Sequence, residues 1–189
     1  MQVKVQSIQF SADEGVRPNT TVSGLSTLRP VFKKGGQVTA GNASTLNDGA
    51  SAVLVADAEY AEQQGWTILA FIEDYCTSGV EPARVMSAPI PAIETLLERN
   101  QLEVSDIDVF EHNEAFASAS CSIAKELNIP HDRLNLHGGA VSLGHPLGSS
   151  GTRCLITMIA VMRRLESSTG IVTLCLGGGN AVAMLVRRD

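Results

Sequence analysis

The sequence has few charged and few aromatic residues, and the shortage of basic residues excludes one class of protein. Charged residues make up 18% of the 189 residues, and 14 basic against 20 acidic side chains leave a formal net charge of −6. Such an acidic chain is poorly suited to hold nucleic-acid phosphates. No apolar run approaches the roughly 18 residues of a membrane span, and the start MQVKVQSIQF lacks the pattern of a signal peptide. We therefore expect no nucleic-acid partner and no membrane partner.

The four cysteines also lack the spacing of a metal site or a redox motif. Cys76, Cys121, Cys154 and Cys175 form no CxxC pair and no zinc-ligand pattern. Reduced thiols are usual inside cells, so the sequence predicts a cytoplasmic protein without a metal site. Glycine is the abundant residue, with 17 in all and nine of them between Gly138 and Gly179. The last quarter of the chain therefore has special backbone requirements.

Apolar patterning predicts strands and helices that alternate along the chain. Hydrophobic residues reach 44%, as in a folded chain with a core. We expect strands at 3–10, 38–43, 52–56, 67–75, 107–110, 170–176 and 181–186, and helices at 57–65, 91–100, 114–128 and 152–165, with a helical turn at 23–28. This order is typical of an α/β layered domain with a mixed sheet.

A polar segment, His112 to Ala117, follows the strand at 107–110 and opens a helix. Open α/β sheets place ligand sites at such strand ends. Asn113 and Glu114 also suit a helix N-terminus, where one side chain caps the helix and the other favours its dipole. The residues alone favour this structural role over a functional one.

A glycine-rich loop, residues 138–151, precedes the helix at 152–165. Free backbone N–H groups before a helix can hold an anion, but the loop has neither a Walker motif nor the spacing GxGxxG. His145 lies between Gly144 and Pro146, where loop structure does not require a histidine. A packing loop with an incidental histidine is the alternative, and we favour a functional one.

Cys175 ends an apolar strand and precedes the three glycines 177–179. Backbone N–H groups beside a thiol can form an oxyanion hole, although a buried cysteine is more often a small hydrophobic residue. Together the three segments offer a thiol, an imidazole and an amide on adjacent strand ends. They indicate acyl transfer or proton abstraction, and an anion-binding module is the alternative.

Several ordered motifs give the chain a resemblance to a known family. They are Val38–Ser44 with Asn47–Ala50, Asn113–Ala117, Gly138–Pro146 and Cys175–Gly179, preceded by Asp13-Glu14, Arg17-Pro18 and Leu28–Pro30. From about residue 10 to its end the chain resembles thiolases of the acetyl-CoA acyltransferase type. The resemblance implies a thiolase-like layered α-β-α fold, with a C-terminal βαβαβαββ half and a mixed sheet.

The resemblance covers only the C-terminal half of such an enzyme. By analogy, residues 1–35 are the tail of the thiolase loop domain, 36–64 the last strands of the N-terminal half, and 65–189 the C-terminal domain. None of the four cysteines matches the motif of the acylated nucleophile. The resemblance therefore implies two kinds of partner, namely an N-terminal thiolase half that supplies this cysteine and further copies in a homo-oligomer.

The resemblance also implies catalytic roles. His145 would take the proton of the nucleophilic cysteine and donate to the thioester oxygen, and Asn113 would hold a water that completes this first oxyanion hole. Cys175 would remove the α-proton of acetyl-CoA in condensation and return it in thiolysis. The backbone N–H of Gly177 would line the second oxyanion hole.

The implied substrates are acyl-CoA and acetyl-CoA, with no cofactor. Arg17 and Ser44 match positions that contact coenzyme A in the family, and Ala115 and Phe116 would line the pantetheine channel. Two alternatives remain beside a working half-enzyme: a truncated thiolase without catalysis, and a CoA-binding module without turnover.

Overall fold

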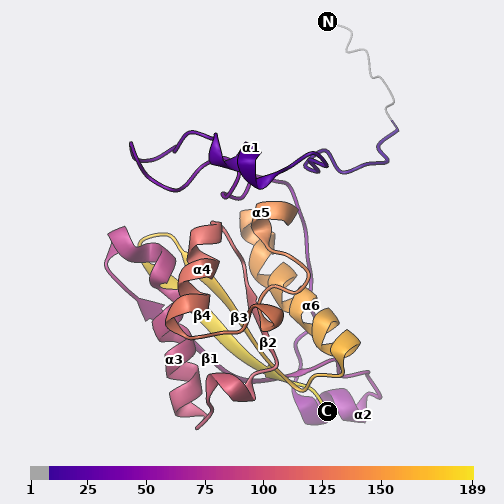
Figure 1. The fold of residues 1–189 in the computed structure, drawn as a ribbon. Coiled ribbons are helices and arrows are strands. Elements are labelled where there is room, and N and C mark those ends of the chain that lie inside the picture. Colours follow the sequence, from indigo (N-terminus) through magenta and orange to yellow (C-terminus); the bar gives the residue numbers. More distant parts are fainter. Residues whose placement is uncertain (1–8) are drawn as a thin grey trace, which may run out of the picture.

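The structure is a computed structural model that describes residues 9–189. Its described part contains a four-stranded sheet in the order β1-β4-β3-β2, seen in Figure 1. The strands are β1 (Phe71–Gly79), β2 (Val109–His112), β3 (Thr169–Leu176) and β4 (Asn180–Arg187). Strand β4 runs antiparallel to both β1 and β3, whereas β2 and β3 are parallel. The predicted mixed sheet is confirmed.

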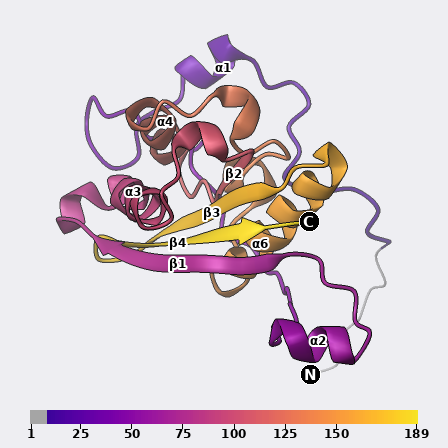
Figure 2. The same ribbon diagram turned by 90° about the horizontal axis from the view of Figure 1, so that it is seen from below.

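Helices cover both faces of this sheet. The described residues form the helices α1 (Val22–Ser26), α2 (Ala58–Gln63), α3 (Pro89–Arg99), α4 (Ala117–Glu126), α5 (Ala140–Leu143) and α6 (Leu147–Leu165), with 3₁₀ turns at Pro82–Ser87, Val104–Asp106 and His131–Arg133. Figure 2 shows α3 and α4 on one face and α6 on the other. The layered α-β-α fold is thus confirmed.

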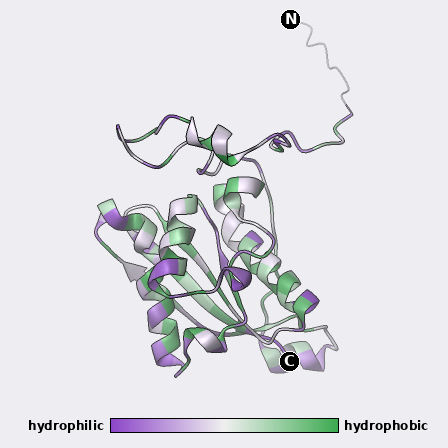
Figure 3. Ribbon diagram, in the orientation of Figure 1, coloured by the Kyte–Doolittle hydropathy of each residue, from purple (hydrophilic) through white to green (hydrophobic). Residues whose placement is uncertain are grey.

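The sheet buries a separate apolar cluster on each face because successive strand side chains point to opposite sides. Ile171 and Leu185 belong to the cluster under α3 and α4, and the next residues, Val172 and Val186, belong to the cluster under α6. Figure 3 shows the strands as mainly hydrophobic ribbons. Gly170 lets α6 approach, since a Cβ there would lie 2.8 Å from two methionine sulfurs of that helix.

Most predicted elements of the C-terminal region are confirmed, with shifted ends. The helices predicted at 91–100 and 152–165 are α3 and α6, and the last two predicted strands are β3 and β4. The expected βαβαβαββ order has one strand more than the structure describes. In the place of that strand, between α4 and α6, Leu134 forms a single parallel bridge to Phe110.

Two predicted strands near the N-terminus are wrong. In the segment 38–43, Ala43 makes only an isolated bridge to Phe116, because the backbone there bonds to the loop before α4. The run 52–56 forms no strand and is exposed, since no strand of residues 9–189 lies beside it to complete its hydrogen bonds. The strand predicted at 3–10 falls largely on residues 1–8, which lie outside the described part.

Candidate active site

The candidate site lies at the carboxyl ends of the parallel strands β2 and β3. The backbone N–H of Asn113, just after β2, donates to the carbonyl of Thr173 in β3 at 3.1 Å. Cys175 lies two residues further along β3, near the same edge of the sheet. The loop that carries His145 leads directly into α6, which packs on both strands.

His145 is held by its backbone and by both ring nitrogens. Its N–H donates to the Thr45 carbonyl at 2.9 Å. Ring atom Nδ1 lies 2.6 Å from Oγ of Ser150, and Nε2 lies 3.3 Å from Nδ2 of Asn113. The residue before it, Gly144, has φ +89°, and a Cβ there would overlap the Asn47 side chain. Glycine at this position therefore lets the loop close around the imidazole.

Asn113 is fully buried and does not cap a helix. Helix α4 begins only at Ala117, so the structural role that the residues alone favoured for Asn113 is wrong. Instead its Oδ1 accepts a hydrogen bond from Nη2 of Arg153 at 3.0 Å, and Nη1 of Arg153 donates to Oε1 of Glu111 at 3.1 Å. Glu111 is also fully buried. A chain of polar side chains thus runs from inside the sheet to the His145 ring.

Burial changes the pKa of several groups in this chain of contacts. It lowers the pKa of His145, and the nearby Arg153 cation lowers it further, so the imidazole is neutral at pH 7. Burial raises the pKa of Glu111 to about 8, although Arg153 acts in the opposite direction. It also raises the pKa of the Cys154 thiol to about 12. A neutral imidazole can accept a proton, as a general base requires.

Cys175 and the glycines that follow it form the second half of the predicted site. Cys175 is partly buried, and burial raises the pKa of its thiol. Gly177 is exposed in the turn between β3 and β4. The carbonyl of Gly179 accepts from the N–H of Val80 at 2.8 Å, which ties this turn to the end of β1. No hydrogen bond within the described residues joins Cys175 to His145.

The segment 42–51 lies against both the loop before α4 and the loop that carries His145. The Ser44 N–H donates to the Ala115 carbonyl at 2.9 Å, and the ring of Phe116 meets that of Phe32 edge-on at 5.8 Å between centroids. The hydroxyls of Ser51 and Ser149 lie 2.7 Å apart. The structure thus brings Ser44, Ala115 and Phe116 together, near the residues that hold His145.

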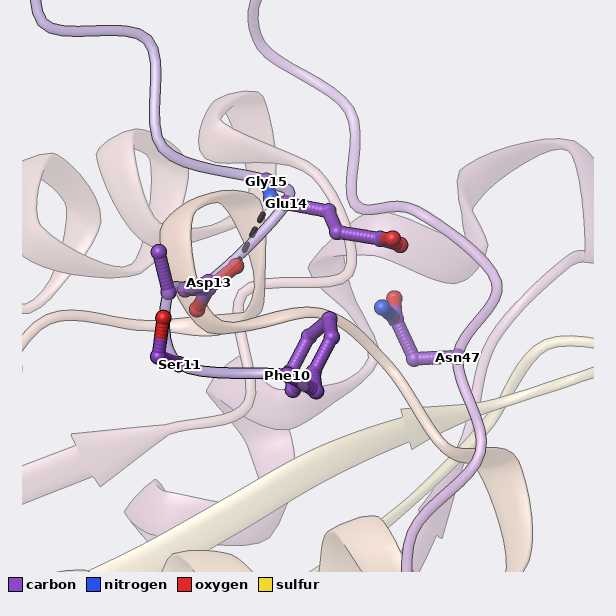
Figure 4. A pocket seen from close by; sticks show the side chains of 7 residues that line it. Phe10, Ser11, Asp13, Glu14, Gly15 and Asn47 are labelled. Carbon is purple, nitrogen blue, oxygen red and sulfur yellow. Dashed lines mark hydrogen bonds between the residues drawn. The ribbon is translucent and has the colours of Figure 1, made fainter. Parts of the chain in front are cut away.

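Arg17 is not joined to this site by any hydrogen bond or ion pair of the described residues. It is exposed, and its carbonyl accepts from Thr20. A hollow of about 520 Å³ lies close by, lined by residues 10–15 and Asn47. Figure 4 shows the side chains of Glu14 and Asn47 extending toward one another across it. Asn47 also accepts from the His145 N–H at 3.3 Å, so the hollow adjoins the His145 loop.

Sequence reasoning missed three residues of the site: Glu111, Ser150 and Arg153. The sequence itself pointed to two of them, Glu111 and Arg153. A carboxylate inside a strand predicted to be buried needs a partner, and Arg153 stands among the apolar residues of a helix expected to be buried. Ser150 had no such signal, because a serine near a helix start is ordinary.

No group of three or more His, Cys, Asp or Glu side chains within 9–189 is placed to hold a metal ion. Within the same residues, no helix is both long and apolar enough to span a bilayer.

Comparison with known proteins adds an independent finding. Residues 66–188 match the family model "Thiolase, C-terminal domain", and residues 1–59 match "Thiolase, N-terminal domain". A "Probable acetyl-CoA acyltransferase" of Staphylococcus aureus is 46% identical over 99% of this chain and 47% of its own length. The chain thus spans about half the length of the curated relatives it matches.

Two solved structures have the same fold. Human mitochondrial 3-ketoacyl-CoA thiolase, in complex with CoA, is 39% identical with a TM-score of 0.90, over 95% of this chain and 46% of that one. Acetyl-CoA acetyltransferase of Bacillus anthracis is 38% identical with a TM-score of 0.91, over 99% and 48% of the two chains. At 39% and 38% sequence identity, both proteins share more with this chain than the fold alone.

Proposed function

Because the chain belongs to the thiolase family, we propose that it is the C-terminal part of an enzyme that transfers acyl groups between coenzyme A thioesters. The reaction is thiolysis of a 3-ketoacyl-CoA or its reverse, the condensation of acetyl-CoA. The names of the relatives and of the structural neighbours support this class of substrate. The division into residues 1–35, 36–64 and 65–189 is part of the same proposal.

One observation carries the proposal, namely the neutral His145 imidazole beside the Asn113 amide. In the proposed reaction, Nε2 of His145 takes the proton from a nucleophilic cysteine supplied by an N-terminal thiolase half. In thiolysis the thiolate then attacks the 3-keto carbonyl of the substrate. The bond between C2 and C3 breaks, so the acyl group stays on the cysteine and the enolate of acetyl-CoA leaves. The thiol of coenzyme A then takes the acyl group and frees the cysteine. The Asn113–His145 distance of 3.3 Å is longer than an ordinary hydrogen bond, so the contact is weak and readily gives way to a reactant or a water.

Cys175 is the proposed second acid/base. Burial raises the pKa of its thiol, so the thiol holds its proton at pH 7 and suits the return of that proton to the α-carbon in thiolysis. In condensation it must lose the proton, and stabilisation of the enolate then becomes decisive. The backbone N–H of Gly177 is the proposed donor to that oxyanion, a kind of contact worth about 3–4 kcal/mol.

The remaining proposals concern binding and assembly. Ser44, Ala115 and Phe116 are proposed to line the path of coenzyme A. The hydrogen bond from Ser44 to Ala115 and the bridge between Ala43 and Phe116 support this. Arg17 is proposed to contact the same substrate. We also propose a homo-oligomer, completed by the N-terminal half, in the cytoplasm.

The test is to co-purify the chain with an N-terminal thiolase half that bears the nucleophile and to measure thiolysis of acetoacetyl-CoA. We expect His145→Ala and Cys175→Ala each to lower kcat by about 10²–10⁴-fold, as for loss of a general acid/base. His131→Ala, at an exposed histidine, is the matched control and should keep full turnover. Unchanged turnover in His145→Ala would contradict the assignment.

A second candidate is a chain that binds coenzyme A without turnover. It is favoured by the four cysteines of the chain, none of which matches the motif of the acylated nucleophile. Calorimetry of the chain alone with coenzyme A distinguishes the candidates. Absence of binding at millimolar ligand would exclude this module, and thiolysis by the pure chain would exclude an inactive protein.

A further inference from the structure

Arg153, near the start of α6, connects two buried residues at the end of β2. Its side chain is 20% exposed, and its two terminal nitrogens donate separately, Nη1 to Glu111 and Nη2 to Asn113. Glu111 and Asn113 are both fully buried. A guanidinium presents donors in a rigid fork, and two acceptors at 3.1 Å and 3.0 Å hold that fork in one orientation.

This arrangement determines which way the Asn113 amide faces. Arginine has donors and no acceptor, so the amide atom that meets Arg153 must be the oxygen. The amide nitrogen must therefore face His145. Because this nitrogen is a donor, the ring atom Nε2 of His145 must accept and carry no proton.

The other ring nitrogen has a matching partner. With Nε2 unprotonated, Nδ1 of the neutral ring carries the proton and donates to Oγ of Ser150 at 2.6 Å. The Ser150 hydroxyl in turn donates to the Pro146 carbonyl at 3.1 Å. From Arg153 through Asn113, His145 and Ser150 to Pro146, each residue thus donates to the next. In the opposite tautomer the protonated Nε2 of His145 would face the amide nitrogen of Asn113, and two donors would meet.

We propose that Arg153, held in place by Glu111, is a positioning residue that selects the tautomer of His145 through the Asn113 amide. The catalytic meaning of this selection rests on the proposed function, because a base that acts through Nε2 needs that atom unprotonated. The selection itself needs neither substrate nor nucleophile. It is therefore testable in the chain alone.

The test is ¹⁵N NMR of the histidine rings in the full chain, at a pH where His145 is neutral. In the wild type we expect Nε2 of His145 at the downfield shift of an unprotonated ring nitrogen, and Nδ1 at that of a protonated one. Arg153→Met removes the guanidinium donors and leaves only the Cys154 thiol, a weak donor 3.6 Å from Oδ1 of Asn113, to favour the wild-type amide orientation. The two orientations therefore come closer in energy, and the two shifts should move toward each other. Arg163→Gln, at an exposed arginine of the same helix, should leave both shifts unchanged.

A second variant covers the case in which Arg153→Met does not fold. The double variant Glu111→Gln, Arg153→Met also replaces the carboxyl group that would stay buried after losing its partner. Glu111→Gln alone keeps an oxygen acceptor for Arg153 and should keep the wild-type tautomer. A wild-type ring protonated at Nε2, or a folded Arg153→Met ring with wild-type shifts, would overturn the proposal.

The turnover of the assembled enzyme supplies a separate readout. Arg153→Met should lower kcat with little change in KM, by at most about 10⁴-fold, the loss known for a catalytic histidine held in the wrong tautomer. If the assembly has no activity at all, the proposed function fails while the NMR result stands. If activity is present and the tautomer does not respond to Arg153, only the positioning role fails.

Discussion

At the scale of single residues, what separates His145 from the other histidines is the combination of fixed orientation and partial access. His112 is fully buried, and burial lowers its pKa to about 3, so it stays neutral and out of contact with solvent. His131 and His137 are exposed. His145 alone is partly buried with a partner at each ring nitrogen. A base must be both oriented and reachable, and these contacts provide the orientation.

Glu111 makes the stability of the fold depend on pH. Burial raises its pKa from 4.5 to about 8, and its Oε2 has no hydrogen-bond partner among residues 9–189. The folded state therefore binds a proton that the unfolded state releases between these two values. It follows that the free energy of unfolding falls as pH rises from about 4.5 to 8, by at most about 1.4 kcal/mol per pH unit.

Urea denaturation at pH 5.5 and at pH 8 checks this prediction. Glu111→Gln is neutral at both values and should lose most of the difference in unfolding free energy between them. Glu126→Gln, at an exposed position of α4, is the control and should retain the wild-type difference. A Glu111→Gln protein with the full wild-type difference would show that another group is responsible.

At the scale of elements, the sequence correctly predicted the helices and strands that pack against other parts of the same chain. The periodicity of α3 and α6 and the apolar runs of β3 and β4 have their complementary surfaces in the same sheet, so pattern and structure agree. The run Val53–Val55 has an equally apolar pattern, but no strand of residues 9–189 pairs with it. The polar links of the site, Arg153 above all, depend on tertiary contacts that periodicity does not encode.

Replacement by alanine should change the stability of the fold in opposite directions at two glycines. Gly179 in the β3–β4 turn has φ +96°, and a Cβ would overlap the Val80 carbonyl, so Gly179→Ala should destabilise by about 1–3 kcal/mol or more. Gly151 lies inside α6, where a Cβ would meet only Leu174 at 4.0 Å. Gly151→Ala should stabilise by about 0.5–1 kcal/mol.

The check is the free energy of unfolding of both variants measured beside the wild type. A Gly179→Ala protein as stable as the wild type would mean that the turn has another accessible conformation. A destabilised Gly151→Ala protein would mean that α6 approaches its neighbours more closely at this turn than its position indicates.

At the scale of the whole molecule, several large apolar side chains have no cover. Val53, Leu54 and Val55 are 42%, 79% and 66% exposed in one continuous run. On α6, Leu147, Ile156 and Leu165 are also exposed. A continuous exposed apolar run such as Val53–Val55 is typical of a surface that contacts another chain, and the chain covers about half of its relatives. These surfaces are where the proposed N-terminal half would pack.

The isolated chain should therefore self-associate, and the run 53–55 should contribute because an extended apolar segment without a partner strand pairs readily with another chain. Leu54→Lys should raise the monomer fraction in sedimentation velocity. Val16→Lys, at a comparably exposed position in the irregular N-terminal segment, is the control and should leave the distribution unchanged. Co-expression with an N-terminal half should replace the self-associated forms by a complex with one copy of each half, or a multiple of it. A wild-type chain that stays monomeric at high concentration would contradict the prediction.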